Sequence, residues 1–212
     1  MIKNIEKELD KIFDKWEEVG INPKAYKLYT VLRDAAKLKQ YQQGYLYHIG
    51  EPGKKQTETY CNVYARDVLD SEYQAHLNSW ANGIGGLVSE YSYDLTPIHP
   101  DYKPASIILN TTIPVAYKNI KEAHKKDNVK LLTPQKAQIM ANEGIPIHVI
   151  SVWCNHEAIV CPNPNGYDKD NGPLLGQAGA YNGIVFLKDK KTFGAYNDLS
   201  DILYVQYNEL RK

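Results

Sequence analysis

Apolar residues recur along the first forty positions with the spacing of two amphipathic helices. The second of them has clear start signals, because Asn22 is a capping residue type and Pro23 suits the first helical turn. Its apolar period continues to about Lys39. The first is predicted over residues 2–19, ending at Gly20, from Ile2, Ile5, Leu9, Ile12, Phe13 and Trp16. The pattern predicts a helical hairpin over residues 1–40, and packing on the main domain, residues 41–212, is favoured over a docking role.

The middle of the chain has a weaker pattern. Residues 40–60 are polar and loop-like, and a short helix is predicted from Cys61 to Leu69, with Thr57 or Thr59 as its cap. Residues 71–128 are irregular, with some helix near Leu87 and again over residues 115–125. A further helix is predicted from the pair Thr133-Pro134 to Gly144.

From residue 145 the apolar pattern changes to that of strands. Strands are predicted over residues 147–153, 156–161, 174–180, 184–187 and 202–207. Cys154 and Asn155 form a short connection between the first two, and Asn182-Gly183 is a good pair for a tight turn. Because helices come first and an antiparallel meander follows, the sequence predicts an α+β fold.

Composition and charge exclude several classes of function. The 212 residues include 25 basic and 25 acidic side chains, so no global field attracts nucleic acid or an anionic membrane. No apolar run is long enough for a membrane span, and the first residues lack the apolar stretch of a signal peptide. We therefore expect a protein kept inside the cell, one whose leader has been removed, or one exported by another machine.

The cysteines indicate thiol chemistry rather than a disulfide framework. The chain has three, with Cys154 and Cys161 in one predicted hairpin and Cys61 apart. An isolated cysteine with a distant histidine is a candidate nucleophile pair. The chain also has 17 tyrosines against 3 phenylalanines, and tyrosine-rich surfaces often line sites for sugars and polar peptides.

Three residues form the predicted catalytic constellation. Cys61 lies at the predicted start of a helix, where the dipole and free N–H groups favour a thiolate and an oxyanion. His156 opens a strand directly after a turn, and Gln177 in the next strand is placed to orient the imidazole. Each also has a simpler interpretation: a small buried hydrophobe for Cys61, a satisfied histidine for His156 and a structural hydrogen bond for Gln177.

At these residues the sequence resembles the NlpC-like and CHAP-like cell-wall peptidases. The segment from Thr59 to Leu69 is similar to their nucleophile helix. Residues 149–153 and 156–160 are similar to their two-strand unit, in which the catalytic histidine opens the second strand. Residues 172–180 are similar to the following strand, which carries the third catalytic residue, and residues 81–84 and 141–144 resemble the flanking segments. The resemblance covers about residues 55–190.

The resemblance implies a papain-like fold that hydrolyses amide bonds of peptidoglycan, as a stem-peptide endopeptidase or amidase. Cys61 would be the nucleophile, His156 the base and then the acid, and Gln177 the orienting group, with Asn182 and Asn163 open as alternatives. No cofactor or metal is implied. A phage-type lysin or an antibacterial toxin delivered by a secretion machine would fit, and a toxin would add an immunity or inhibitor protein as partner.

Other classes of function remain open at this stage. Four residues of zinc-binding types lie close together in the sequence, although their spacing is poor: His148, Cys154, His156 and Cys161. A non-enzymatic module that binds glycan or protein is the second alternative, and an acyltransferase on the same thiol scaffold is the third. Trp153 is expected in the core or as a wall near the site.

Overall fold

The computed structural model describes residues 2–18, 22–37, 61, 64–65, 68–69, 112–127, 129–179, 181–196 and 198–207. Helix α1 spans Ile2–Glu18 and α2 spans Pro23–Ala35. The cap at Asn22 is confirmed, since its side chain accepts a hydrogen bond from the Ala25 N–H at 3.1 Å. The predicted end near Lys39 overextends α2. The predicted Gly20 terminus, the Thr57 or Thr59 cap and the helix near Leu87 lie outside the described residues.

A charged network joins the two N-terminal helices. The Asp10 carboxylate accepts hydrogen bonds from the Tyr29 hydroxyl at 2.6 Å and from Arg33 at 2.7 Å. Burial alone would raise the pKa of Asp10, but these two bonds and the Arg33 charge lower it overall. The Phe13 ring stacks on Tyr29 with centroids 4.2 Å apart. The carboxylate therefore stays charged where it fixes α1 against α2.

In the part of the chain that the structure describes, the sheet has six antiparallel strands in the order β1-β6-β2-β3-β4-β5. Strands β2 to β5 form the predicted meander, and β6 returns between β2 and β1. The sequence pattern missed β1, which is short and, among the described strands, pairs with β6 alone. The bounds are β1 Val129–Leu132, β2 His148–Ser151, β3 His156–Val160, β4 Leu174–Gln177, β5 Gly183–Phe186 and β6 Leu203–Tyr207.

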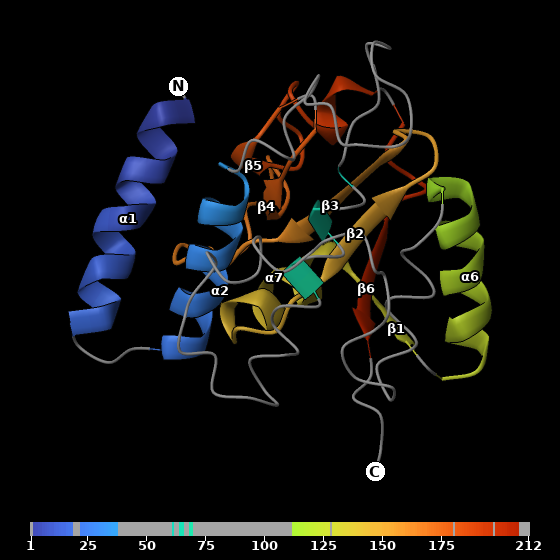
Figure 1. The fold of residues 1–212 in the computed structure, drawn as a ribbon, viewed down its shortest axis with the longest axis horizontal. Coiled ribbons are helices and arrows are strands. Elements are labelled where there is room, and N and C mark those ends of the chain that lie inside the picture. Colours follow the sequence, from blue (N-terminus) through green and yellow to red (C-terminus); the bar gives the residue numbers. More distant parts are fainter. Residues whose placement is uncertain are drawn as a thin grey trace, which may run out of the picture.

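Helices flank both sides of this sheet (Figure 1). Helices α1 and α2 pack beside β4 and β5, and α6 (Ile113–Lys125) packs beside β1 and β2. Helix α7 (Pro134–Asn142) contacts β3 and β6, and its cap is confirmed because the Thr133 hydroxyl accepts from the Lys136 N–H. Helices and an antiparallel sheet confirm the α+β class.

Side chains on the two faces of the sheet belong to two buried clusters. The first cluster contains Leu32, Cys61, Tyr64, Ile159 and Ala178 among its members. The second contains Ala137, Ala158, Val160, Leu175 and Phe193 among its members. Because successive side chains of a strand alternate between faces, Ala158 and Ile159 fall into different clusters. The apolar faces of α1 and α2 lie in the first cluster, so the hairpin packs on the main domain as favoured.

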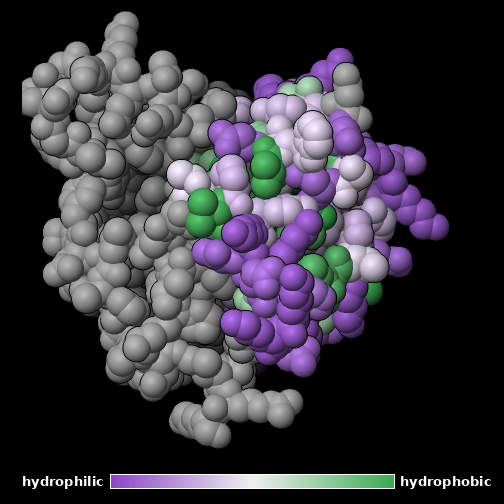
Figure 2. All heavy atoms as spheres, turned by 90° about the vertical axis from the view of Figure 1, so that its right-hand side faces the viewer, coloured by the Kyte–Doolittle hydropathy of each residue, from purple (hydrophilic) through white to green (hydrophobic). Residues whose placement is uncertain are grey.

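Helix α6 presents a hydrophilic outer surface. Its buried side consists of Ile113, Ala116 and Ile120, while its exposed lysines include Lys118 and Lys121. Figure 2 shows this side of the molecule, where hydrophilic residues predominate and the hydrophobic ones lie scattered. Scattered exposed apolar residues are normal for a protein surface. Among the described residues, no helix has the length and apolarity needed to cross a bilayer.

Gly176→Ala is expected to destabilise the fold. A Cβ at this position in β4 would lie 2.9 Å from both the Leu32 Cβ and the Tyr64 hydroxyl. That hydroxyl donates to the Leu32 carbonyl at 3.1 Å, so neither group can move freely. We expect a loss of about 1–3 kcal/mol in the free energy of unfolding, measured by urea denaturation. An unchanged denaturation midpoint would show that α2 does not press on β4 this closely.

Candidate functional site

His156 and Gln177 lie side by side on one face of the sheet. His156 is the first residue of β3, and Gln177 is the last residue of β4. The register pairs Ile159 with Gly176, so His156 and Gln177 point to the same face. The His156 Nε2 and the Gln177 Oε1 are 2.8 Å apart. The predicted contact between these two residues is confirmed.

The hydrogen bonds of Gln177 determine which ring nitrogen of His156 carries the proton. The Gln177 amide nitrogen donates to the carbonyl of Tyr181 at 3.4 Å and to that of Lys191 at 3.3 Å. Only its oxygen is then left to face the imidazole, and an amide oxygen can only accept. The His156 Nε2 must therefore carry a hydrogen. In the neutral ring, Nδ1 is left as the basic nitrogen.

The surroundings of His156 keep the imidazole neutral. Burial lowers its pKa, an effect that the Gln177 hydrogen bond offsets only in part. The ring packs on Phe193, with centroids 4.9 Å apart. A neutral imidazole with a fixed tautomer and an unprotonated Nδ1 is the form that a general base requires.

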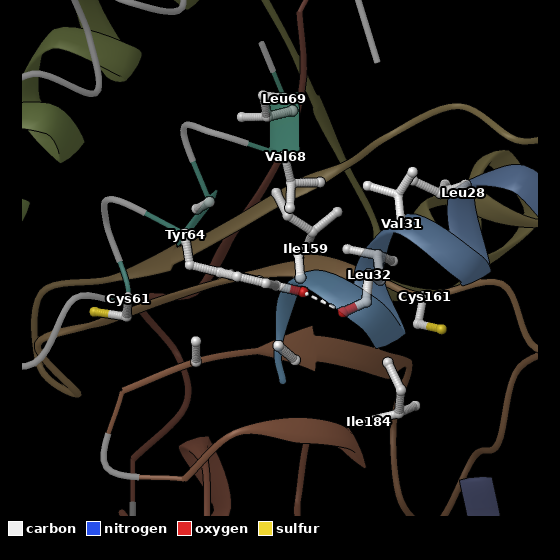
Figure 3. Close-up of a cluster of buried hydrophobic side chains, with 14 of the residues drawn as sticks. Leu28, Val31, Leu32, Cys61, Tyr64, Val68, Leu69, Ile159, Cys161 and Ile184 are labelled. Carbon is white, nitrogen blue, oxygen red and sulfur yellow. Dashed lines mark hydrogen bonds between the residues drawn. The ribbon is translucent and has the colours of Figure 1, made fainter. Parts of the chain in front are cut away.

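Cys61 is helical and belongs to the first cluster, with only 1% of its surface exposed. In Figure 3, Ile159 lies between Cys61 and Cys161, and the Cys61 sulfur points away from the Tyr64 ring. Because β3 runs from His156 towards Cys161, Cys61 lies towards the end of the sheet where β3 begins. His156, in contrast, contacts Phe193 of the second cluster. The described contacts do not join Cys61 to His156, so this pairing stays a prediction.

The other two cysteines have surroundings that suit packing. Cys154 is buried in the turn between β2 and β3, and burial raises the pKa of its thiol, with the charges of Asp201 and Asp198 adding to the effect. Its Ser151 contact offsets this only partly. The Cys161 thiol is fully buried and donates to the Pro162 carbonyl at 3.5 Å. A raised pKa keeps a thiol protonated and poorly nucleophilic.

The four zinc-binding residue types do not gather at one point. His148 lies opposite Ile159 in the sheet register and so faces the first cluster, whereas His156 contacts the second. The His148 ring is 2.9 Å from the Tyr207 hydroxyl and 3.4 Å from the buried Glu157 carboxylate. Among the described residues, no group of three or more His, Cys, Asp or Glu is placed to hold a metal ion.

Asp201 holds the turn that precedes His156, a role that the sequence did not indicate. Its carboxylate accepts from the Ser151 hydroxyl at 2.6 Å and from the N–H groups of Val152 and Trp153 at 2.8 and 3.0 Å. The expectation of a core position for Trp153 is wrong, since this side chain is 70% exposed. A fixed backbone thus presents an exposed aromatic ring three residues before His156.

The two alternatives to Gln177 have other roles. Asn182 joins the β4–β5 turn to α2, donating to the Ala36 carbonyl and accepting from the Gly179 N–H, both at 3.0 Å. Asn163 stabilises its own loop by donating to the Gly166 carbonyl. Of the three polar residues considered, Gln177 is the one in contact with His156.

The described geometry therefore gives an oriented His156–Gln177 pair with a fixed turn beside it, while Cys61 lies buried in the first cluster. This arrangement can perform acid–base chemistry at Nδ1 of His156. Comparisons with protein-family models, with curated proteins and with solved structures find no match.

Proposed function

We propose that this protein is a cysteine hydrolase that cleaves amide bonds of bacterial peptidoglycan. Cys61 is the nucleophile, His156 the general base and then the acid, and Gln177 the orienting residue. The main observation behind this proposal is the 2.8 Å contact between His156 Nε2 and Gln177 Oε1. It leaves Nδ1 of a neutral imidazole as the nitrogen that accepts a proton.

The reaction follows from these roles. Nδ1 of His156 takes the proton of the Cys61 thiol, and the thiolate sulfur attacks the amide carbonyl carbon. The imidazolium then gives its proton to the leaving amine as the C–N bond breaks, which forms a thioester on Cys61. A water molecule attacks this thioester after losing a proton to Nδ1, and the Cys61 thiol is regenerated as the acid product leaves. The Gln177 oxygen keeps its hydrogen bond to Nε2–H throughout and stabilises the positive charge of the His156 imidazolium.

The proposed mechanism requires that the nucleophile and the base come into contact. The Cys61 thiol and Nδ1 of His156 must meet beyond the end of the sheet, where β3 begins and β4 ends. The position of Cys61 towards that end and the direction of its sulfur away from Tyr64 are compatible with this demand. A strand-terminal histidine suits it as well, because the sheet does not continue past this residue.

The choice of peptidoglycan rests on the resemblance of residues 55–190 to NlpC-like and CHAP-like peptidases. The exposed Trp153 ring adds support, because aromatic rings with one free face pack against sugars and peptides. An immunity or inhibitor protein is the proposed partner if the protein acts as a delivered toxin.

Thiol labelling tests the pairing directly. With a limiting amount of iodoacetamide at neutral pH, we expect Cys61 to be modified first, and more slowly in the His156→Ala variant. Cys154 and Cys161 serve as internal controls, because all three thiols are buried to the same degree and the pKa of Cys154 is raised, so faster labelling of Cys61 reports its activation. Mass mapping of the modified peptide reads the site, and released fragments of purified peptidoglycan then identify the bond.

Three results would argue against this proposal. Equal labelling rates at Cys61 with and without His156 would show that the imidazole does not activate this thiol. Peptidoglycan that is bound but not cut, with equal binding by Cys61→Ala, would favour a non-enzymatic binding module. New amides formed when an amine is added to the assay would indicate acyl transfer on the same thioester.

A further inference from the structure

The chain segment whose backbone accepts a hydrogen bond from the Gln177 amide also carries a positively charged side chain, that of Lys191. Lys191, whose carbonyl accepts from the Gln177 amide, has an exposed side chain. Its ammonium lies 5.1 Å from the centroid of the Tyr181 ring, and the Tyr181 carbonyl accepts the other hydrogen bond of the same amide. The two residues whose carbonyls orient Gln177 therefore also form a cation–π contact with each other.

The backbone of Lys191 belongs to a turn that is held by its own hydrogen bonds. The Asp189 carboxylate accepts from the Lys191 N–H at 2.9 Å, and the Thr192 N–H donates to the Asp189 carbonyl at 3.0 Å. A side chain at Gly194 would meet the Lys188 carbonyl oxygen at 2.0 Å, so the chain passes closely over itself here. Phe193, two residues after Lys191, touches the His156 ring. The turn and the proposed base are thus parts of one packed unit.

The Lys191 ammonium forms no ion pair with a carboxylate in the described part of the chain. The ion pairs found there involve Arg33, Lys37 and Lys125. A cation on an aromatic face keeps its N–H groups available on the other side, and a substrate anion can bind them. Peptide stems offer such an anion in their free carboxylates.

We propose that Lys191, whose ammonium lies over the Tyr181 ring and whose carbonyl accepts from Gln177, binds a free carboxylate of the substrate peptide and so selects which peptides the site accepts. This inference rests on the proposed function and adds a specificity-determining residue to it. The charge-assisted contact forms when the substrate binds, before any bond is broken. Its loss therefore acts on KM more than on kcat.

The test compares two synthetic stem peptides that differ only in having free carboxylates or primary amides. We expect the wild-type protein to favour the free-carboxylate peptide by about tenfold in kcat/KM, as a charged hydrogen bond allows. Lys191→Met should abolish this preference by raising KM, and Lys191→Arg should keep it. The matched control is Lys190→Met, which removes the same charge from the neighbouring exposed residue and should leave the preference intact.

A binding measurement separates this inference from the proposed function. Calorimetric titration of both peptides into Cys61→Ala, with and without Lys191→Met, needs no turnover. If no variant cleaves peptide, the proposed hydrolase activity fails, and a carboxylate preference lost in Lys191→Met still supports the role of Lys191. Equal affinity for both peptides, a preference that survives Lys191→Met, or no detectable binding of either peptide would overturn it.

Discussion

Cys61→Ala is expected to lower the rate of peptidoglycan hydrolysis by about 10⁴-fold or more, because removal of a nucleophile leaves only the residual effects of binding and positioning. The substitution removes one sulfur atom from a buried side chain. The resulting small cavity should cost about 1 kcal/mol in the free energy of unfolding. Release of soluble fragments from purified sacculi measures the first effect, and urea denaturation measures the second.

The other cysteines provide matched controls for this experiment. Cys161→Ala also removes a buried thiol from the first cluster, and Cys154→Ala removes one from the second. Both should cost a similar amount of stability and leave hydrolysis nearly unchanged. A Cys61→Ala variant that loses several kcal/mol of stability, or that remains active, would mean that Cys61 is a structural thiol.

His156→Ala is expected to lower the rate by roughly 10²- to 10⁴-fold, the usual contribution of a general base and acid. The physical reason is that the Gln177 contact leaves Nδ1 of His156 unprotonated, so this nitrogen is the one that takes up and returns the proton. The comparison variant is Gln177→Ala, which removes the orienting group but leaves the base, so its loss of rate should be smaller. Equal rates for His156→Ala and the wild type would remove His156 from the mechanism.

The pH dependence gives a second readout for the same two residues. Burial lowers the pKa of His156 below its ordinary value of about 6.5. Below about pH 6.5, His156 takes up a proton in the unfolded chain but not in the folded protein. The folded state therefore loses stability as the pH falls from about 6.5 towards the lowered pKa. Above that window His156 contributes no pH dependence. His156→Ala should therefore flatten the stability curve below about pH 6.5, as measured by urea denaturation across pH 5–8.

Gln177→Ala is expected to shift the low-pH limb of the rate profile. The Gln177 hydrogen bond raises the pKa of His156 and opposes the effect of burial. Gln177→Ala removes that stabilisation of the imidazolium, so the acid limb of the rate profile should shift to lower pH while the maximum rate falls. An acid limb that stays in place would show that another group sets it.

The sequence by itself determined the features that depend on neighbouring residues. Asn22-Pro23 and Thr133-Pro134 each start a helix, because the caps and the proline act within one turn. The strands around His156 and Gln177 follow from short apolar runs bounded by turn residues. Adjacent strands in a meander bring these two residues together, so their contact could be predicted as well.

Only the tertiary structure decided the features that depend on residues far apart in the chain. The insertion of β6 between β1 and β2 brings Asp201 to the turn before His156, a contact across about fifty residues that leaves no local pattern. The carbonyls of Tyr181 and Lys191 turn the Gln177 amide and so select the tautomer of His156. Because the acceptors are backbone carbonyls, these hydrogen bonds do not depend on which side chains stand at positions 181 and 191. The sequence therefore carries no signal for them.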